Sequence, residues 1–209
     1  MNNSTINPVD QSTISYRYRH KNQNSIYYLK PRSSEIWILD FKVQGFVKEN
    51  LLGKVLLPDR FSSIQLLNGH IYIVGGMIQD LISRNSYEID GNMNIIDRPP
   101  MSKARYNCSL TLIFERFIFA IGGYVGKNVG TEIVECLDTN SNMWFQVGAL
   151  NKARSCTTAS CVGNRFIYVF PGVQKETWNT IEFLDLGQNT NGSPQLDPRE
   201  FKKLKWSVL

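Results

Sequence analysis

The sequence predicts an all-β fold built from about four repeated units of about 50 residues, and three recurring features lead to this prediction. The first feature is a short apolar run that ends in a glycine pair, at residues 70–77 (HIYIVGGM) and 116–125 (RFIFAIGGYV). Such a run is typical of a strand that is buried on both faces and ends in a sharp turn. Glycine suits this ending because it can adopt positive φ and lets a neighbouring backbone approach closely. A third version, at residues 165–173, has Pro171 in place of the first glycine.

The second feature is an aspartate that ends a later apolar strand in each unit. These residues are Asp40, Asp90, Asp138 and Asp185, spaced by 50, 48 and 47 residues. The third feature is the tripeptide Lys-Ala-Arg at residues 103–105, which returns 49 residues later at 152–154, while Arg60 precedes Gly75 at a similar distance. The glycine turns keep the same step, with 47 residues from Gly75 to Gly122. A period near 50 residues with several strands per unit indicates a β-propeller.

In these features the chain resembles the kelch repeat. That family's unit has four strands, with a diglycine ending the second, an aromatic-Asp pair near the end of the third, and a tryptophan opening the fourth. The third unit fits best, with Gly122-Gly123, then Leu137-Asp138, and then Trp144, with six residues between Leu137 and Trp144. The same offset places Ile96 in the second unit and Phe46 in the first. The positions assigned to the structural repeat are Gly75, Gly76, Gly122, Gly123, Gly172, Asp40, Asp90, Asp138, Asp185, Trp144 and Trp206.

The chain departs from the kelch pattern mainly in its outer units. The third strands lack the family's tyrosine, Pro171 replaces a glycine, and the first unit has no diglycine where SIYYLK runs into Pro31. The resemblance implies a kelch-like β-propeller with about four blades of four-stranded antiparallel sheet, either closed as a small ring or left as a partial arc. Residues 1–11 are expected to form a disordered polar tail, and 12–209 the propeller, with units at about 12–57, 58–100, 101–150 and 151–209. Residues 187–200 are expected to form a long loop, and almost no helix is expected.

Composition favours a globular protein without a membrane anchor. Hydrophobic residues make up 42% and charged residues 20%, which is enough apolar surface to build a core. No run of about 18 apolar residues is present, and the polar start lacks a basic-then-apolar pattern. We therefore expect neither a membrane span nor a secretory signal, and a cytoplasmic location.

No catalytic, cofactor or metal site is predicted. The four cysteines, Cys108, Cys136, Cys156 and Cys161, contain no C-x-x-C pair and are all expected inside strands as small buried apolar residues. The histidines, His20 and His70, fall in different units. The segment 122–130 (GGYVGKNVG) lacks the Lys-Ser/Thr of a phosphate-binding loop and is expected to be a flexible connection. An enzyme is therefore not expected.

The charge distribution has two basic clusters within a net charge of +5. One contains Arg17, Arg19, His20 and Lys21, and the other contains Arg199, Lys202, Lys203 and Lys205. In a closed ring the first and last units would be neighbours, so the clusters could form one patch for an acidic partner. The alternative is a solvated face that aids solubility.

The resemblance implies a non-enzymatic protein-interaction module, a scaffold or adaptor that binds through the loops between second and third strands. The residues predicted to contact the partner are Arg84, Tyr124, Lys127, Lys175 and Trp178. Three alternatives remain open: a substrate-recognition subunit of a ubiquitin ligase, an actin-binding protein, and a kelch-type sugar epimerase. The expected partner is a protein, with an acidic one as an option. Nucleic acid is not expected, and self-association is expected if the arc is open.

Overall fold

The computed structural model describes residues 25–41, 44–53, 55–187 and 196–209, which form four main antiparallel sheets and two additional two-stranded hairpins. The first sheet contains β1 (Ser25–Leu29), β2 (Glu35–Asp40) and β3 (Gly45–Asn50). The second contains β4 (Ser62–Gln65), β5 (Ile71–Val74), β8 (Ser86–Ile89) and β9 (Ile95–Arg98). The third contains β10 (Ser109–Ile113), β11 (Phe117–Ile121), β14 (Val134–Asp138) and β15 (Met143–Gln146). The fourth contains β16 (Ala159–Val162), β17 (Phe166–Val169), β18 (Glu182–Asp185) and β19 (Ser207–Val208). The predicted all-β class is confirmed.

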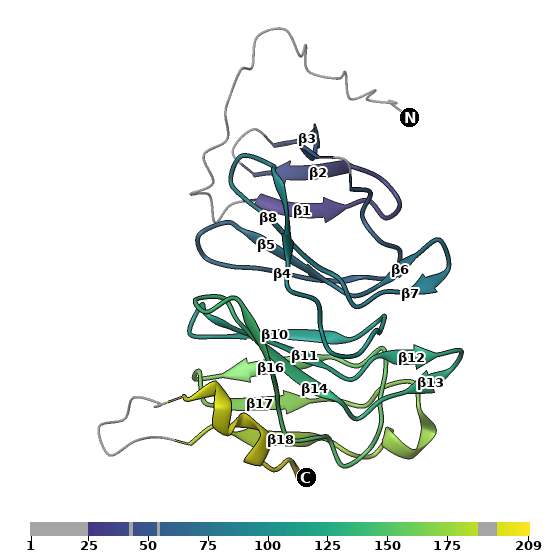
Figure 1. Cartoon of the computed structure of the whole chain (residues 1–209), viewed down its shortest axis with the longest axis vertical. Coiled ribbons are helices and arrows are strands. Elements are labelled where there is room, and N and C mark those ends of the chain that lie inside the picture. The colour runs from purple at the N-terminus through teal and green to yellow at the C-terminus, as the bar shows by residue number, and fades with distance from the viewer. Residues whose placement is uncertain (1–24, 42–43, 54, 188–195) are drawn as a thin grey trace, which may run out of the picture.

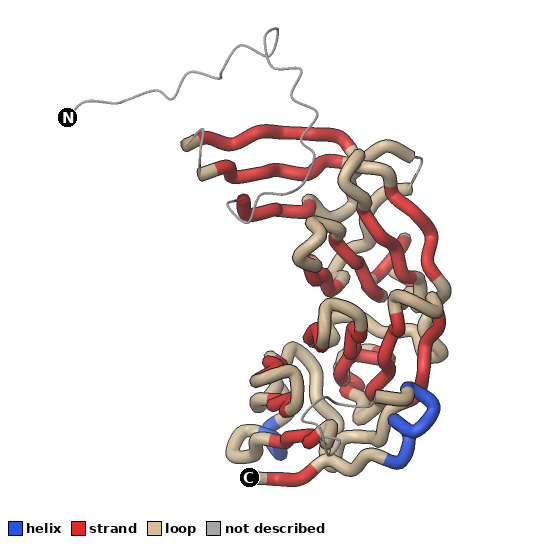
Figure 2. The backbone as a smooth tube through the Cα atoms, turned by 90° about the vertical axis from the view of Figure 1, so that its left-hand side faces the viewer, coloured by secondary structure: helices blue, strands red, loops and turns tan. Residues whose placement is uncertain are grey.

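The four sheets follow one another along an open arc (Figures 1 and 2). The first sheet lies at one tip and the fourth at the other, so the described residues form an arc and not the closed ring that was the other option. The first and last units are therefore not neighbours here. Residues 1–24 lie outside the described residues. They include the predicted tail at 1–11, the basic cluster at 17–21 and the beginning of the predicted first unit.

The core is divided into layers between neighbouring sheets. Ile36 and Ile38 of the first sheet pack with Ile71 and Ile73 of the second. In the same way, residues of the second and third sheets share one cluster, and residues of the third and fourth share another. Middle strands are buried on both faces, as in β11, where all five residues are buried. Each sheet is thus stabilised mainly by its neighbours along the arc, as in repeat proteins.

Two short 3₁₀ helices, η1 (Lys175–Thr177) and η2 (Pro198–Lys203), interrupt the strands. The second overlaps the segment 187–200 that was predicted to be a loop, so that prediction is wrong for its last residues. Asp197 caps η2 by accepting a hydrogen bond from the Arg199 backbone N–H at 3.0 Å. Phe201 then packs into the third sheet, with its ring centroid 5.6 Å from that of Phe117. The cap and the buried ring explain why this segment is helical.

The repeated aspartates close the turns between third and fourth strands. Asp138 accepts hydrogen bonds from the Asn140 N–H at 3.1 Å and the Ser141 hydroxyl at 2.8 Å, and it pairs with Arg116. Asp185 repeats this arrangement with Gly187 and Arg165. The carboxylate therefore holds the turn and also links it to the start of the second strand.

Acid should weaken the fold through Asp138. The hydrogen bond from Arg116, supported by Ser141 and Asn140, lowers the pKa of this buried carboxyl to about 2. Because the folded pKa lies below the unfolded one, this stabilisation is complete above the unfolded pKa and is lost as pH falls toward the folded value. Asp138→Asn should reduce the free energy of unfolding at neutral pH by roughly 1–2 kcal/mol. It should also flatten the fall in stability on acidification, measured by urea unfolding at several pH values. Asp80→Asn, at a carboxylate that is 88% exposed, is the matched control. An Asp138→Asn protein with an unchanged acid dependence would contradict this role.

The two repeat tryptophans make equivalent hydrogen bonds. The Trp144 indole N–H donates to the Pro99 carbonyl at 2.7 Å, and the Trp206 indole N–H donates to the Gly148 carbonyl at 2.8 Å. The two acceptors are 49 residues apart, which is the repeat step. Each indole thus fixes the segment that leads from one sheet to the next.

The cysteines differ from their predicted positions. Cys136 and Cys161 lie in strands, but Cys108 and Cys156 lie outside them, so the expectation that all four are inside strands is wrong. Cys156 is exposed and has a φ of 48°, because it occupies a tight turn just before β16, the first strand of the fourth sheet.

Among the described residues, no helix is long and apolar enough to cross a membrane.

Candidate functional site

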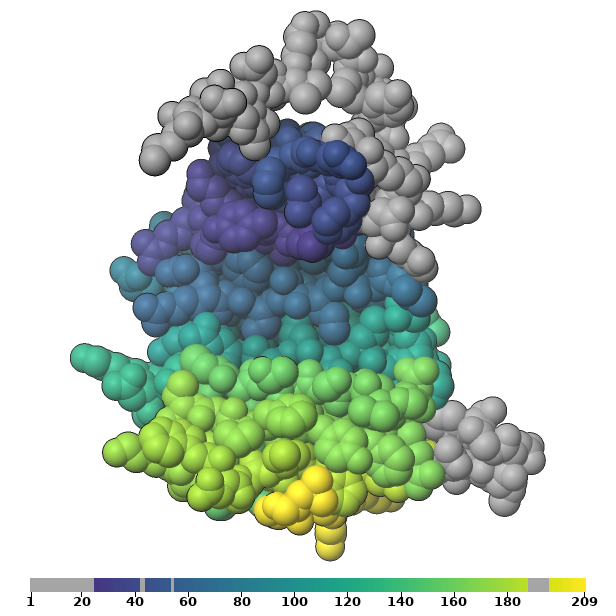
Figure 3. Space-filling view, turned by 180° about the vertical axis from the view of Figure 1, so that it is seen from behind, coloured from purple at the N-terminus to yellow at the C-terminus, as the bar shows by residue number. Residues whose placement is uncertain are grey.

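The most prominent surface feature is a row of three loops, which we call the loop edge. It consists of the hairpin β6 (Met77–Ile78) to β7 (Leu81–Ile82), the hairpin β12 (Tyr124–Gly126) to β13 (Val129–Gly130), and residues 170–179 with η1. Each connects the second and third main strands of its sheet, and all three project from the same side of the molecule (Figure 1). Seen from behind, the β12–β13 hairpin protrudes clearly from the surface (Figure 3). The segment 122–130, predicted to be a flexible connection, is therefore a β-hairpin.

Each loop of the loop edge carries an exposed apolar side chain. Leu81 is 73% exposed, Val129 54% and Trp178 57%. Exposed apolar side chains that gather on protruding loops mark interaction surfaces more often than isolated ones do. The three loops thus present separate apolar contact points at successive sheets of the arc.

The five residues predicted to contact a partner all lie on or next to the loop edge. Arg84 follows β7 and is exposed, and Lys127 is exposed in the turn of the β12–β13 hairpin. Lys175 begins η1 and Trp178 follows it, both exposed. Leu81 and Val129 were not predicted, because the sequence argument considered only aromatic and basic side chains.

Tyr124 differs from the other four because its ring is partly buried. It stacks on Tyr106 with 5.1 Å between ring centroids, and the Arg60 guanidinium lies 5.6 Å from the Tyr106 ring. Backbone hydrogen bonds also join Tyr124 and Tyr106 in both directions. Tyr124 therefore anchors the base of its hairpin as well as contributing to the surface.

The two glycine pairs bring the bases of the first two loops against the next unit. Gly76 donates its N–H to the Arg105 carbonyl at 2.9 Å, and Gly123 donates to the Arg154 carbonyl at the same distance. Gly75 and Gly122 have φ values of 65° and 61°, and a Cβ on either would overlap the same two carbonyl oxygens. Glycine is required here both for its left-handed conformation and for this close approach.

Two fully buried arginines hold the loops from beneath. The Arg105 guanidinium donates to the Ile133 carbonyl at 2.7 Å and the Gly122 carbonyl at 3.3 Å, and it forms an ion pair with Glu135. These two carbonyls flank the β12–β13 hairpin.

Arg154 makes the same set of contacts one unit later. Its guanidinium donates to the Phe170 carbonyl at 3.1 Å and the Thr180 carbonyl at 3.3 Å, and it pairs with Glu182. Each arginine therefore contacts one loop through its own carbonyl and the next loop through its side chain. The repeated tripeptide was visible in the sequence, but these ion pairs were not predicted. The available signal was a glutamate three residues before the repeated aspartate, at Glu135 and Glu182.

Arg60 is not the counterpart of these arginines, although its spacing from Gly75 suggested that it was. It is exposed, and it matches Asn107 and Cys156, which share its left-handed φ near 50°. The Asn107 N–H donates to the Arg60 carbonyl, and the Cys156 N–H donates to the Asn107 carbonyl, each at 3.1 Å. These bonds join three successive sheets through the turns before their first strands, β4, β10 and β16.

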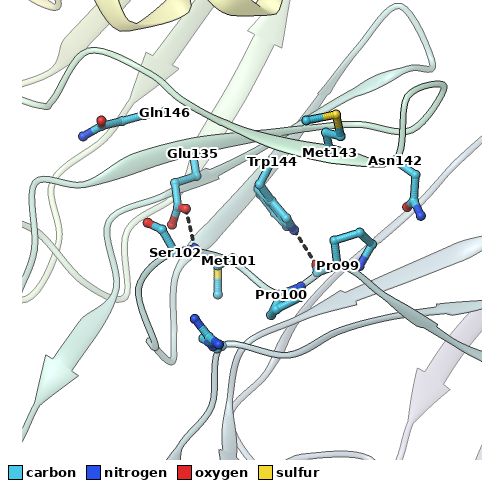
Figure 4. A pocket seen from close by; sticks show the side chains of 10 residues that line it. Pro99, Pro100, Met101, Ser102, Glu135, Asn142, Met143, Trp144 and Gln146 are labelled. Atoms are coloured by element: carbon cyan, nitrogen blue, oxygen red, sulfur yellow. Dashed lines mark hydrogen bonds between the residues drawn. The ribbon is translucent and has the colours of Figure 1, made fainter.

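A groove of about 620 Å³ lies between the second and third sheets (Figure 4). Its lining includes Arg84, Met101, Glu135 and Trp144. Glu135 is already engaged by Arg105 and by the Ser102 backbone N–H at 2.7 Å. This carboxylate therefore serves as a hydrogen-bond acceptor within the fold and does not point freely into the groove.

In the part of the chain that the structure describes, no group of three His, Cys, Asp or Glu side chains lies close enough together to hold a metal ion. His70 contacts Glu88, which is also paired with Arg98. His20 lies outside the described residues.

Models of known protein families give no match to this chain, and a search of curated proteins also gives none. The geometry of the loop edge is therefore the observation that points to a function.

Proposed function

We propose that the protein is a non-enzymatic interaction module of kelch-repeat type that binds a partner protein through the loop edge. The observation that carries this proposal is that three successive sheets each present an exposed apolar side chain on a loop at the same side of the arc. Basic side chains at Arg84, Lys127 and Lys175 accompany them. This combination of apolar and cationic groups suits a partner surface with apolar sites and acidic neighbours.

The rigidity of the loops supports the same proposal. Gln174 accepts a hydrogen bond from the Ser155 N–H at 2.8 Å and donates to the Ser155 hydroxyl at 2.6 Å, which fixes the loop before η1. The Met77 and Asp59 backbones exchange hydrogen bonds of 2.7 and 2.8 Å beneath the first hairpin. Loops that are already ordered lose little conformational entropy on binding. The sugar-epimerase alternative gains no comparable support, since the carboxylate at the groove is committed to Arg105.

Removing the apolar side chains of the loop edge should abolish partner capture. We would use the full chain with Leu81→Ser, Val129→Ser and Trp178→Ala as bait and compare captured proteins with those of the wild type. The affinity for the specific partner should fall at least about tenfold, because exposed apolar and aromatic anchors provide much of the binding energy at interfaces. The melting temperature should stay the same, since all three side chains are exposed.

Leu67→Ser provides the matched control. Leu67 is 71% exposed in the turn between β4 and β5, at the opposite end of its sheet from the loop edge. Capture should survive this substitution. A triple variant that keeps the wild-type affinity would show that the loop edge is not the binding surface.

A further inference from the structure

The outer face of the first sheet is apolar and exposed, and we call it the start face. It consists of Ile26, Tyr28, Trp37, Leu39 and Phe46. Alternation places these side chains opposite Leu29, Ile36 and Ile38, which pack on the second sheet. Phe46 is 70% exposed, Tyr28 58% and Ile26 57%.

The same positions are buried in every later sheet. Leu39, the residue before the repeated aspartate, corresponds to Ile89, Leu137 and Leu184, which are at most 1% exposed. Its cross-strand neighbour Ile26 corresponds to Ile71, Ile118 and Ile167, which are at most 4% exposed. In those sheets these positions contact the preceding sheet. The start face is therefore an inter-sheet contact surface that has no partner among the described residues.

The outer face of the fourth sheet is the complementary surface, and we call it the end face. It consists of Val162, Phe166, Tyr168 and Phe183, with Tyr168 stacked on Phe183 at 6.0 Å. Val162 is 53% exposed, whereas its counterpart Ile113 in the third sheet is fully buried. Phe117 and Phe119, the counterparts of Phe166 and Tyr168, pack against the fourth sheet.

We propose that the start face of one copy of this chain packs against the end face of a second copy. Between the third and fourth sheets, the face with Phe117 and Phe119 packs on the face with Ile167 and Leu184. The first of these faces corresponds to the end face and the second to the start face. The proposed contact repeats this pairing between two molecules. Because the two tips of the arc carry different faces, the contact is heterologous. Two arcs joined at both tips would close into one ring of eight sheets, which lies within the range of about 4–8 blades found in propellers.

The test measures the molar mass of the full chain by light scattering and sedimentation velocity. The wild type should have twice the chain mass of 23.9 kDa. Phe46→Glu blocks the start face and Val162→Glu blocks the end face. Each should make the protein monomeric and weaken association at least about a hundredfold, because a charge would be buried without a partner. Leu67→Glu, at an exposed residue outside both faces, should remain dimeric.

Mixing the two monomeric variants distinguishes this contact from others. The intact start face of the Val162→Glu protein should bind the intact end face of the Phe46→Glu protein, so the mixture should form a heterodimer. Unchanged circular dichroism and melting of the separate variants, with Ile26→Glu as a second start-face variant, would show that the fold is intact.

Three results would overturn the proposal. They are a monomeric wild type, as expected if the chain's own residues 1–24 cover the start face, a Val162→Glu protein that still dimerises, and a mixture that stays monomeric. The loop-edge triple variant should dimerise normally, so failure here is separate from failure of the proposed function.

Discussion

Replacing Arg154 by methionine should lower the free energy of unfolding by about 3–5 kcal/mol. The arginine is fully buried, and its loss leaves Glu182 as a buried carboxylate without its cation. The Phe170 and Thr180 carbonyls at the base of the last loop would lose their hydrogen bonds from the guanidinium at the same time. The change should be seen as a lower urea midpoint, and residues 170–179 should exchange their amide hydrogens faster.

Two further variants distinguish the effect of burying the ion pair on stability from the effect of the pairing itself. Arg165→Met removes the partner of Asp185 at a position where the arginine is 33% exposed, so its cost should be much smaller than that of Arg154→Met. Adding Glu182→Gln to Arg154→Met should recover part of the lost stability, because the unpaired buried charge is gone. Equal losses for Arg154→Met and Arg165→Met would contradict the role given to the buried pair.

Gly122→Ala should be strongly destabilising, costing about 3 kcal/mol or more. Alanine is strained at a φ of 61°, and its Cβ would overlap the Arg154 carbonyl oxygen. The structure can relieve the overlap only by moving the β12–β13 hairpin away from the fourth sheet. Thermal or urea unfolding would measure the loss.

Gly163→Ala isolates the effect of the overlap. Gly163 has the same φ of 61°, but nothing lies within 4 Å of the added Cβ. This variant should lose only the cost of the left-handed conformation, about 1–2 kcal/mol. If the two alanine variants are equally stable, the close approach of the glycine pair to Arg154 does not matter to the fold.

The repeat step made most of the sheet order predictable. Gly122-Gly123 follows the second strand and Asp138 ends the third strand of a unit whose four main strands the structure places in sequence order within one sheet. The buried partners of the Lys-Ala-Arg arginines were not predictable from spacing alone. Glu135 lies 30 residues after Arg105 in an apolar strand, and only the close approach of two sheets brings them together. The assignment of Arg60 was wrong for the same reason, because distance along the chain does not specify which turn position a residue occupies.

The proposed binding residues were predictable in part. Loops between second and third strands were expected to present the contact surface, and Lys127 and Trp178 lie on them and are exposed. Leu81 and Val129 were missed because an apolar residue in a sequence does not reveal whether a short hairpin lifts it away from the core. The open arc was also undecided from sequence, since ring closure depends on the angle between sheets and not on the repeat pattern.

Hydrogen–deuterium exchange of the full chain, alone and with its captured partner, would test the proposed binding mode most directly. Binding through the loop edge should give new protection at residues 77–82, 124–130 and 170–179, and none at the turn of residues 66–70. Protection confined to β1, β3 and β16 would mean that the partner binds the tips of the arc, and it would contradict binding through the loop edge.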